Sequence, residues 1–299
     1  MSVPERQLET WSHIGSLVQS ASTYQSIKAV IESRDSPYAN QDITSYLQGS
    51  YGNHTNIVGV ESDVDIVLRS KVVYYPDLHR LPQDQKDHYE RVRSGASYSV
   101  EQFRTDVGGW LQENYGRDFD PGVKALKIKG NSSRRSADVL ACCQYRRYIR
   151  FNGHQDSQFI EGVCFKLPNG KLIANFPKQH HDNCVKKHQE TNSYFKAMVR
   201  IWKNMRNQMT DQSLIQRGIA PSYYIEGLLW NVPSHLFGHS YERTFLQCYS
   251  YLHYADKTQL VCANQNAWLI RKGEATSWDP DHFDTFFDAL GGYWDNFNA

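Results

Sequence analysis

Two carboxylates, Asp63 and Asp65, stand two residues apart in the run SDVDIVL, whose apolar residues predict a β-strand. Side chains on a strand alternate between its faces, so both carboxylates point the same way while Val64 and Ile66 point into the core. Two carboxylates on one face repel each other unless a cation lies between them. Mg²⁺ suits such a pair, because it takes oxygen ligands and is usually held by one or two carboxylates together with substrate phosphates.

A Gly-Ser turn lies just upstream, between a strand predicted over residues 43–47 and a short polar helix. Gly49 lets the backbone approach a phosphate closely, and Ser50 adds a hydroxyl. The start of the following helix offers free N–H donors and a partial positive charge. A Gly-Ser pair alone is often only a turn, and a D-x-D pair is common at exposed strand ends. In strand-turn-helix-strand order, the two together indicate a site that holds a nucleoside triphosphate over metal ions.

A third acid, Asp138, stands near the start of another predicted strand in the run SADVLACCQY. A site with two metal ions needs such a partner, because the ions lie about 3.5 to 4 Å apart to stabilise the attacking and leaving oxygens together. The alternative is a purely structural aspartate that caps its own turn. Beside Asp63 and Asp65, we interpret Asp138 as the third ligand of the same metal site.

These three runs, GSY, SDVDIVL and ADV on a later strand, resemble the DNA polymerase β-type nucleotidyltransferase superfamily. Within it, the chain is similar over most of its length to the cGAS/DncV-like nucleotidyltransferases (CD-NTases) of bacterial anti-phage CBASS systems. The resemblance implies an enzyme with Asp63, Asp65 and Asp138 as catalytic residues, holding two Mg²⁺ or Mn²⁺ ions. It would join ribonucleoside triphosphates into a cyclic or short linear oligonucleotide that activates a separate effector. The residues alone indicate only phosphoryl or nucleotidyl transfer.

The fold implied by the resemblance is α+β. It has a polymerase β-type core with a mixed or antiparallel sheet flanked by helices, a C-terminal helical lobe, and the active site in the cleft between them. At 299 residues the chain is long enough for this arrangement. The pattern changes from strand to helix near Pro177, so we expect a catalytic core over residues 1–176 and a helical domain over residues 177–299.

Apolar residues recur at helical spacing over residues 8–33 and predict one long N-terminal helix. The resemblance implies that this helix is the spine that backs both lobes. Residues 74–85, rich in Pro, Asp and His, are expected to form a loop. Residues 99–115 predict a second helix with Ser99 as its cap. A hairpin is expected around the turn at residues 168–170.

A helix predicted over residues 191–208 carries four basic side chains off its apolar stripe, Lys196, Arg200, Lys203 and Arg206. The family resemblance implies that a lysine of this helix binds the triphosphate. Lys203 is the better match by its distance from the next motif, and Arg200 is the alternative. Lys196 is interpreted as solvated.

That next motif, IAPSYYIEGLLWNVP, predicts a helix that starts at Pro221 and Ser222. On a structural interpretation Ser222 caps the helix, whereas the resemblance implies that it contacts the donor triphosphate. The resemblance also implies that an aromatic ring here stacks on the donor base, which contributes roughly 1 to 3 kcal/mol. We choose Tyr223 over Tyr224 because it directly follows the serine.

The preceding polar stretch stands where relatives contact the nucleobase, and we assign specificity to no single member of it: His180, His181, Asp182, Asn183 and His188.

Five arginines fall within a short span: Arg134, Arg135, Arg146, Arg147 and Arg150. We favour a solvated strand edge protected by positive charge. The alternative is a surface for an RNA or DNA activator, as the resemblance to the DNA-binding animal relative implies. This alternative is weaker because the sequence shows no zinc-ribbon insertion of the kind that this relative uses. The net charge of +1 argues neither for nor against a polyanionic partner.

No apolar run reaches the length of a signal peptide or a transmembrane helix, and the six cysteines follow no zinc-binding spacing. We therefore expect a cytoplasmic protein with no membrane partner, whose thiols are buried and reduced.

Two other functions would use the same residues. A nucleotidyltransferase that modifies RNA ends or a protein would need a tract for its polymer, which the arginines would have to supply. A catalytically silent sensor of nucleotides or nucleic acids would be expected to lose an acid or the Gly-Ser pair, and all of these are present.

Overall fold

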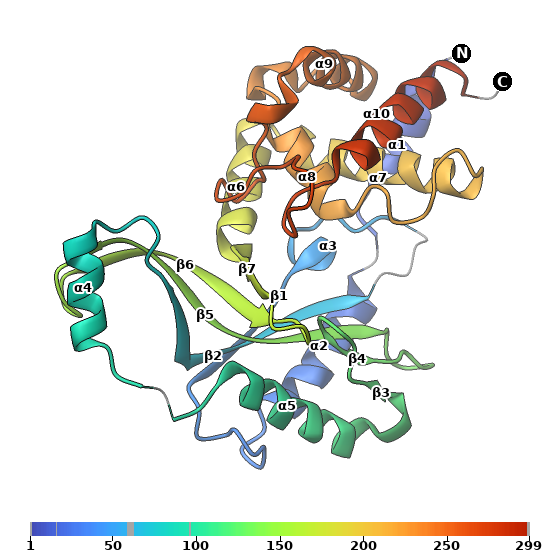
Figure 1. The fold of residues 1–299 in the computed structure, drawn as a ribbon. Coiled ribbons are helices and arrows are strands. Elements are labelled where there is room, and N and C mark those ends of the chain that lie inside the picture. The colour runs from blue at the N-terminus through green and yellow to red at the C-terminus, as the bar shows by residue number, and fades with distance from the viewer. Residues whose placement is uncertain (1, 16, 59–62, 96, 298–299) are drawn as a thin grey trace. The chain divides into compact units, whose positions relative to one another are not determined.

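The computed structural model describes residues 2–15, 17–58, 63–95 and 97–297. The chain forms two compact units (Figure 1). The helical unit comprises residues 1–17, 49–62 and 178–299, and the sheet unit comprises residues 18–48 and 63–177. This partition differs from the single boundary after residue 176 that the sequence predicts, because residues 1–17 and 49–62 belong to the helical unit. No described helix has both the length and the apolar character needed to cross a membrane.

The sheet unit is built on a mixed sheet. Its described strands are β1 (Ile43–Leu47), β2 (Val64–Asp77), β3 (Phe119–Asp120), β4 (Leu126–Ile128), β5 (Ala137–Phe151), β6 (Ser157–Lys166) and β7 (Leu172–Asn175). They run in the order β1-β2-β5-β4-β3, with β6 paired to β5 and β7 to β6. Strands β2 and β5 are parallel, and the other described pairs are antiparallel. The predicted mixed sheet is confirmed, as is the β6–β7 hairpin.

Helices α2 (Val18–Ile31) and α5 (Val100–Tyr115) pack on one face of this sheet (Figure 1). Helix α5 begins as predicted, because the Ser99 hydroxyl accepts a hydrogen bond from the Gln102 backbone N–H at 3.1 Å. The Trp110 indole N–H donates to the Val30 carbonyl at 2.8 Å and ties the two helices together.

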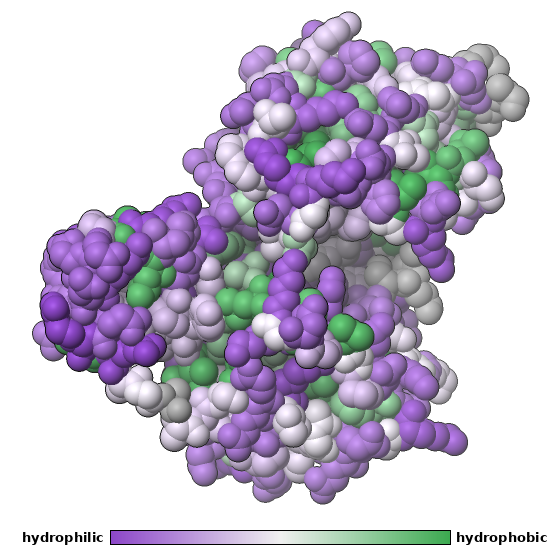
Figure 2. Space-filling view, viewed as in Figure 1, coloured by the Kyte–Doolittle hydropathy of each residue, from purple (hydrophilic) through white to green (hydrophobic). Residues whose placement is uncertain are grey.

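The predicted loop over residues 74–85 is wrong for most of its length. Strand β2 continues to Asp77, because it resumes its pairing with β5 after a register shift that follows Ser70. Helix α4 (Gln83–Val92) then begins. Its Tyr89 packs against Tyr148 and Phe151 of β5, which supplies the apolar contact that the local composition did not reveal. The surface over α4 is mainly hydrophilic (Figure 2).

The predicted single helix over residues 8–33 is also wrong. Helix α1 (Glu5–Ser12) and helix α2 are separate and belong to different units. The chain leaves α1 in an extended conformation at His13. Gly15 then exchanges hydrogen bonds with Asn56, and a side chain at Gly15 would collide with the Ile57 carbonyl. This close contact with a distant segment overrides the local helical pattern.

The helical unit packs around α7 (Tyr194–Asp211), against which α1, α8 (Ser222–Trp230), α9 (Tyr241–Tyr254) and α10 (Pro280–Asp295) lie. Its remaining α-helices in the described residues are α3 (Gly49–Gly52) and α6 (Pro177–Glu190). The predicted apolar stripe of α7 is confirmed, since its members are fully buried: Phe195, Met198, Val199, Trp202 and Met205. Short 3₁₀ turns follow α5, α8 and α9 at Gly116–Asp118, Ser234–Leu236 and Lys257–Gln259.

Candidate active site

The parallel pairing of β2 and β5 places two of the three acids side by side. Asp65 is the register partner of Asp138, and neighbouring strands lie about 4.8 Å apart. Both side chains are half-buried, and Asp63, just before β2, is exposed. Val64 and Ile66 alternate with the acids and are fully buried, as the strand pattern predicts. Val67 and Leu140, which share the strand faces of Asp65 and Asp138, pack in one cluster, whereas Val100 of α5 packs with Cys143 on the other face of β5. The acids therefore lie on the sheet face opposite to α5.

The surroundings of Asp138 disfavour the ionised form of its carboxyl. Burial raises the pKa of its carboxyl above the usual 3.8, and the charges of Asp63 and Asp120 raise it further, while Lys127 lowers it. Lys127 is the register partner of Asp138 on the other side, and Asp120 is the partner of Lys127. A divalent cation would relieve this repulsion, because it favours the ionised form of each carboxylate around it.

The donor set fits a magnesium or manganese ion. Carboxylate oxygens on adjacent strands are the ligands that hard divalent cations take, usually together with substrate phosphates. Asp63, Asp65 and Asp138 would hold such ions. The assignment of individual ligands remains a prediction.

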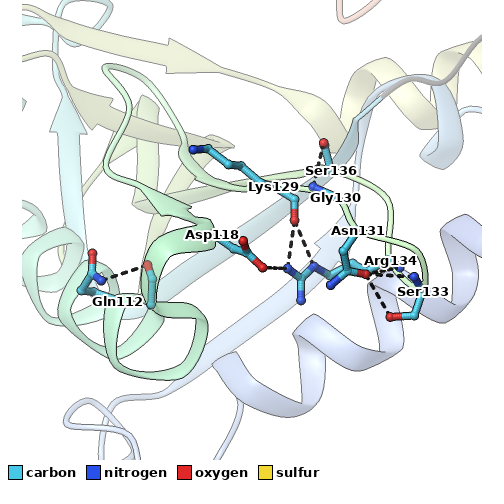
Figure 3. A network of polar contacts seen from close by, with 9 residues as sticks. Gln112, Asp118, Lys129, Gly130, Asn131, Ser133, Arg134 and Ser136 are labelled. Carbon is cyan, nitrogen blue, oxygen red and sulfur yellow. Dashed lines mark hydrogen bonds and ion pairs between the residues drawn. The ribbon is translucent and has the colours of Figure 1, made fainter.

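The loop that leads into β5 is fixed by a polar network (Figure 3). The Arg134 guanidinium donates to Asp118 at 3.0 Å and to the Lys129 carbonyl at 2.9 Å. Asn131 accepts from the Arg134 backbone N–H at 2.9 Å. Because this loop ends directly before β5, the network fixes the approach of the backbone to Asp138. Arg134 thus has a structural role.

Other members of the arginine span are occupied in the same way. Arg147 pairs with Asp77 at 3.0 Å and Arg150 with Asp156 at 2.7 Å. The Arg146 guanidinium lies over the Tyr74 ring at 3.9 Å from its centroid. The expected solvated strand edge is wrong, because β5 pairs with β2 on one side and with β4 and β6 on the other, and the Arg134 and Arg147 side chains are only 14% and 15% exposed. The contacts of these arginines within the sheet unit also argue against an open polyanion-binding surface.

In the helical unit, the structure brings together Ser50 and Lys203. Gly49 opens α3 with a φ of 64°, a left-handed value that favours glycine. The Lys203 ammonium donates to the Ser50 hydroxyl at 2.8 Å and to the Thr55 carbonyl at 2.7 Å. Lys203 is only 3% exposed. Helix α3 is a single turn, so its backbone N–H groups, rather than a helix dipole, are what it offers a phosphate.

Arg200, the alternative to Lys203, is engaged elsewhere. Its guanidinium donates to the Ser12 carbonyl at 2.5 Å and to the His54 carbonyl at 2.7 Å. Lys203 also makes two hydrogen bonds, but one of them is to Ser50, the hydroxyl predicted to bind phosphate, and this contact favours Lys203 over Arg200. The phosphate-binding role of Lys203 remains a prediction. The expectation that Lys196 is solvated is wrong, because only 5% of this residue is exposed.

At the start of α8, Ser222 does not cap the helix. Pro221 occupies the cap position without a side-chain bond, and the Ser222 hydroxyl instead lies 3.4 Å from Arg206. The Tyr223 ring stacks on His180 with centroids 4.8 Å apart, and its hydroxyl accepts from the Asn264 amide at 2.8 Å. Base stacking by Tyr223 remains a prediction.

Tyr224 faces the core of the helical unit. Its hydroxyl donates to the Ser277 carbonyl at 2.9 Å, and its ring stacks on the buried Trp278 with centroids 5.7 Å apart. Both rings are therefore engaged within the helical unit, and the choice of Tyr223 over Tyr224 remains a prediction.

A buried carboxylate, Glu226, was missed by the sequence reasoning. It is 2% exposed, and one of its oxygens accepts from the Thr55 hydroxyl at 2.5 Å. The other accepts from the Asn53 amide at 2.9 Å and lies 2.6 Å from His180 Nε2. The signal that could have revealed it is a lone charged residue beside Ile225 in an otherwise apolar helix.

The six cysteines are all buried and free, as expected.

Comparison with known proteins agrees with this geometry. Residues 182–295 match the family model of the cGAS/DncV-like nucleotidyltransferase C-terminal helical domain. The chain is 37% identical over 266 residues to the cyclic UMP-AMP synthase of Rhodothermus marinus, covering 88% of each. It is 30% identical over 303 residues to the cyclic nucleotide synthase CdnE01 of Staphylococcus haemolyticus, covering 98% of this chain and 99% of that protein.

The structure is also similar to that of the R. marinus CdnE c-UMP-AMP synthase solved with Apcpp and Upnpp. The TM-score is 0.88 at 33% identity, over 99% of this chain and 98% of that chain. Together with the paired acids on β2 and β5, these similarities show that the chain belongs to the cGAS/DncV-like nucleotidyltransferases.

Proposed function

We propose that this enzyme is a cyclic dinucleotide or trinucleotide synthase that joins ribonucleoside triphosphates by two-metal nucleotidyl transfer and releases pyrophosphate. The observation that carries the proposal is the register of Asp65 with Asp138, with Asp63 two residues away, in a chain whose named relatives are cyclic nucleotide synthases. The product would act as a second messenger for a separate effector in anti-phage defence.

The chain's own residues would divide the work between metal binding and nucleotide binding. Asp63 and Asp65 would hold an ion against the donor phosphates, and Asp138 would join them in holding a second. When bound, the ions supply Lewis-acid chemistry that lowers the pKa of an acceptor ribose hydroxyl and neutralises charge on the leaving pyrophosphate. The carboxylates orient the reactants, so no nucleophilic serine or cysteine is required.

The nucleotide would be bound by residues of the helical unit. Gly49, Ser50, Lys203 and Ser222 would contact the triphosphate, and Tyr223 would stack on the donor base. The contact of the Lys203 ammonium with the Ser50 hydroxyl supports this assignment, because a buried cation beside a hydroxyl suits phosphate oxygens.

The proposal is tested against RNA-end modification by one labelling experiment. Purified protein is incubated with α-labelled ribonucleoside triphosphates and Mg²⁺ or Mn²⁺, with and without added RNA. We expect the label in a small product that resists phosphatase. Label that appears in the RNA instead would overturn the proposal in favour of the end-modifying alternative.

The same experiment addresses an RNA or DNA activator at the arginines between Arg134 and Arg150. Arg134, Arg147 and Arg150 are paired with carboxylates, so we expect added nucleic acid to leave the rate of product formation unchanged. Stimulation that is lost in an Arg150→Glu variant would contradict this.

A further inference from the structure

We propose that Glu226 is a positioning residue that anchors the Gly-Ser segment, residues 49–56, and thereby sets Ser50 against Lys203. The inference deepens the proposed function and rests on the role given there to Ser50 and Lys203. It concerns contacts within the helical unit alone.

The anchor joins three parts of that unit. Glu226 extends from α8 and receives two hydrogen bonds from the Gly-Ser segment, one from the Thr55 hydroxyl and one from the Asn53 amide. His180 Nε2 of α6 lies 2.6 Å from the same oxygen that Asn53 reaches. Both carboxylate oxygens are therefore occupied by side chains that converge from two other elements.

Thr55 carries the effect of the anchor to the phosphate-binding residues. Its hydroxyl is held by Glu226, while its carbonyl accepts from Lys203 at 2.7 Å. Its backbone N–H donates to the Ser50 carbonyl at 2.9 Å, and the Lys203 ammonium reaches the Ser50 hydroxyl. A displacement of Thr55 would therefore move Ser50 and Lys203 relative to each other.

The charge of Glu226 is stabilised by its surroundings. Burial by itself raises the pKa of this carboxyl, but the hydrogen bonds from His180 and Thr55 and the positive charge of Lys203 outweigh it and lower the pKa below its usual 4.5. The carboxylate is surrounded by hydrogen-bond donors from Asn53, Thr55 and His180. Such a buried network specifies a geometry, because removing one member leaves the others without their partner.

A metal site is the competing explanation, because ligand atoms of His180, Cys184 and Glu226 lie within 4.8 Å of one another. Both Glu226 oxygens already accept hydrogen bonds, which a metal would have to displace. Burial and the charge of Glu226 also raise the pKa of the Cys184 thiol well above its usual value, which opposes the thiolate that a metal requires. The contacts therefore indicate a hydrogen-bonded anchor.

The test uses Glu226→Gln together with the pair Thr55→Val and Thr55→Ser in the full chain. Each of Glu226→Gln and Thr55→Val should raise KM for ribonucleoside triphosphates about tenfold or more, because each loses a hydrogen bond to a buried charge. The effects should not add in the double variant, since both changes break one contact. Thr55→Ser keeps the hydroxyl and should restore KM. Glu190→Gln, at a half-exposed carboxylate of α6, is the matched control and should leave KM unchanged.

Several results would overturn the anchor. If Glu226 is purely structural, Glu226→Gln lowers the thermal unfolding midpoint but leaves KM and kcat unchanged at temperatures below that midpoint. Additive effects, or failure of Thr55→Ser to restore KM, would contradict a shared contact. Stoichiometric zinc in the wild-type protein that is lost in Glu226→Gln would establish the metal site instead. If Glu226→Gln does not fold, the comparison of KM between Thr55→Val and Thr55→Ser still tests the anchor.

The outcome is separable from that of the proposed function. The dissociation constant of ATP with Mg²⁺ is measured for the same variants by calorimetry. Weaker binding in Thr55→Val but not in Thr55→Ser supports the anchor, whether or not a cyclic product forms. Equal binding by both variants, in a wild-type protein that does make the product, rejects the anchor and leaves the function intact.

Discussion

A carboxylate that is half-buried among other carboxylates is difficult to ionise, and Asp138 occupies such a position. Burial and Asp63 raise its pKa, with a further contribution from Asp120. The folded protein therefore favours the protonated form of this group relative to the unfolded chain. Residues that assemble a metal site in this way weaken the metal-free fold, and binding of the ions compensates.

This repulsion predicts that Asp138→Asn stabilises the metal-free protein. The destabilising contribution of Asp138 is fully present above its folded-state pKa, and it is relieved as the pH falls through that pKa towards the unfolded value of 3.8. In EDTA, we expect a higher thermal unfolding midpoint for Asp138→Asn at pH 7, with a difference from wild type that shrinks on acidification. Asp156→Asn, which loses a surface ion pair with Arg150, is the control. An unchanged or lower midpoint for Asp138→Asn at pH 7 would contradict the charge argument.

Tyr223 and Tyr224 give a second prediction for single residues. Tyr223→Ala should raise KM for the donor nucleotide about tenfold or more, because stacking on a base is worth roughly 1 to 3 kcal/mol. Tyr224→Phe, which loses the bond to the Ser277 carbonyl, should lower the unfolding midpoint and leave KM unchanged. Steady-state kinetics on both variants check the assignment, and a KM effect confined to the Tyr224 variant would reverse it.

Helix α7 presents two cations one turn apart with different partners. Lys203 contacts Ser50 and Thr55, whereas Arg200 contacts the Ser12 and His54 carbonyls. We predict that Lys203→Met raises KM for ribonucleoside triphosphates at least about tenfold, as expected for a lost charge-assisted contact to phosphate. Arg200→Met should instead lower the unfolding midpoint and leave KM close to that of the wild type. A KM effect in the arginine variant alone would transfer the phosphate-binding role to Arg200.

How far the sequence predicts these elements depends on whether the determining contacts are local. Strand alternation places Asp65 opposite to the buried Ile66, and helical periodicity identifies the buried stripe of α7 that contains Trp202, because both patterns lie within one element. The break between α1 and α2 depends instead on the contact of Gly15 with Ile57, more than 40 residues away. No local pattern records such a contact.

The same distinction applies to the candidate site. Asp63, Asp65 and Asp138 are recognisable from type and spacing, whereas the register that places Asp65 beside Asp138 appears only in the sheet. Glu226 was passed over because its partners, Asn53 and Thr55, lie more than 170 residues away in the chain. Lys196 is interpreted as solvated from its place off the apolar stripe, but it is buried by neighbouring elements of the helical unit.

At the scale of the whole molecule, the chain passes between its two units several times, and Gly49 stands directly after one of these passages. The acids belong to the sheet unit, and the residues assigned to the nucleotide belong to the helical unit. Three of the five clustered arginines are paired with carboxylates, which suits an enzyme for small anionic substrates better than one for a polymer.

The central claim is that Asp63, Asp65 and Asp138 make this protein a synthase of cyclic nucleotides. It is tested most directly by mass spectrometry of the products formed from all four ribonucleoside triphosphates with Mg²⁺ or Mn²⁺. We predict a phosphatase-resistant cyclic product in the wild type and a loss of about 1,000-fold or more in Asp63→Asn, corresponding to about 4 kcal/mol of transition-state stabilisation. An undiminished yield of that product from the folded Asp63→Asn variant would contradict the account.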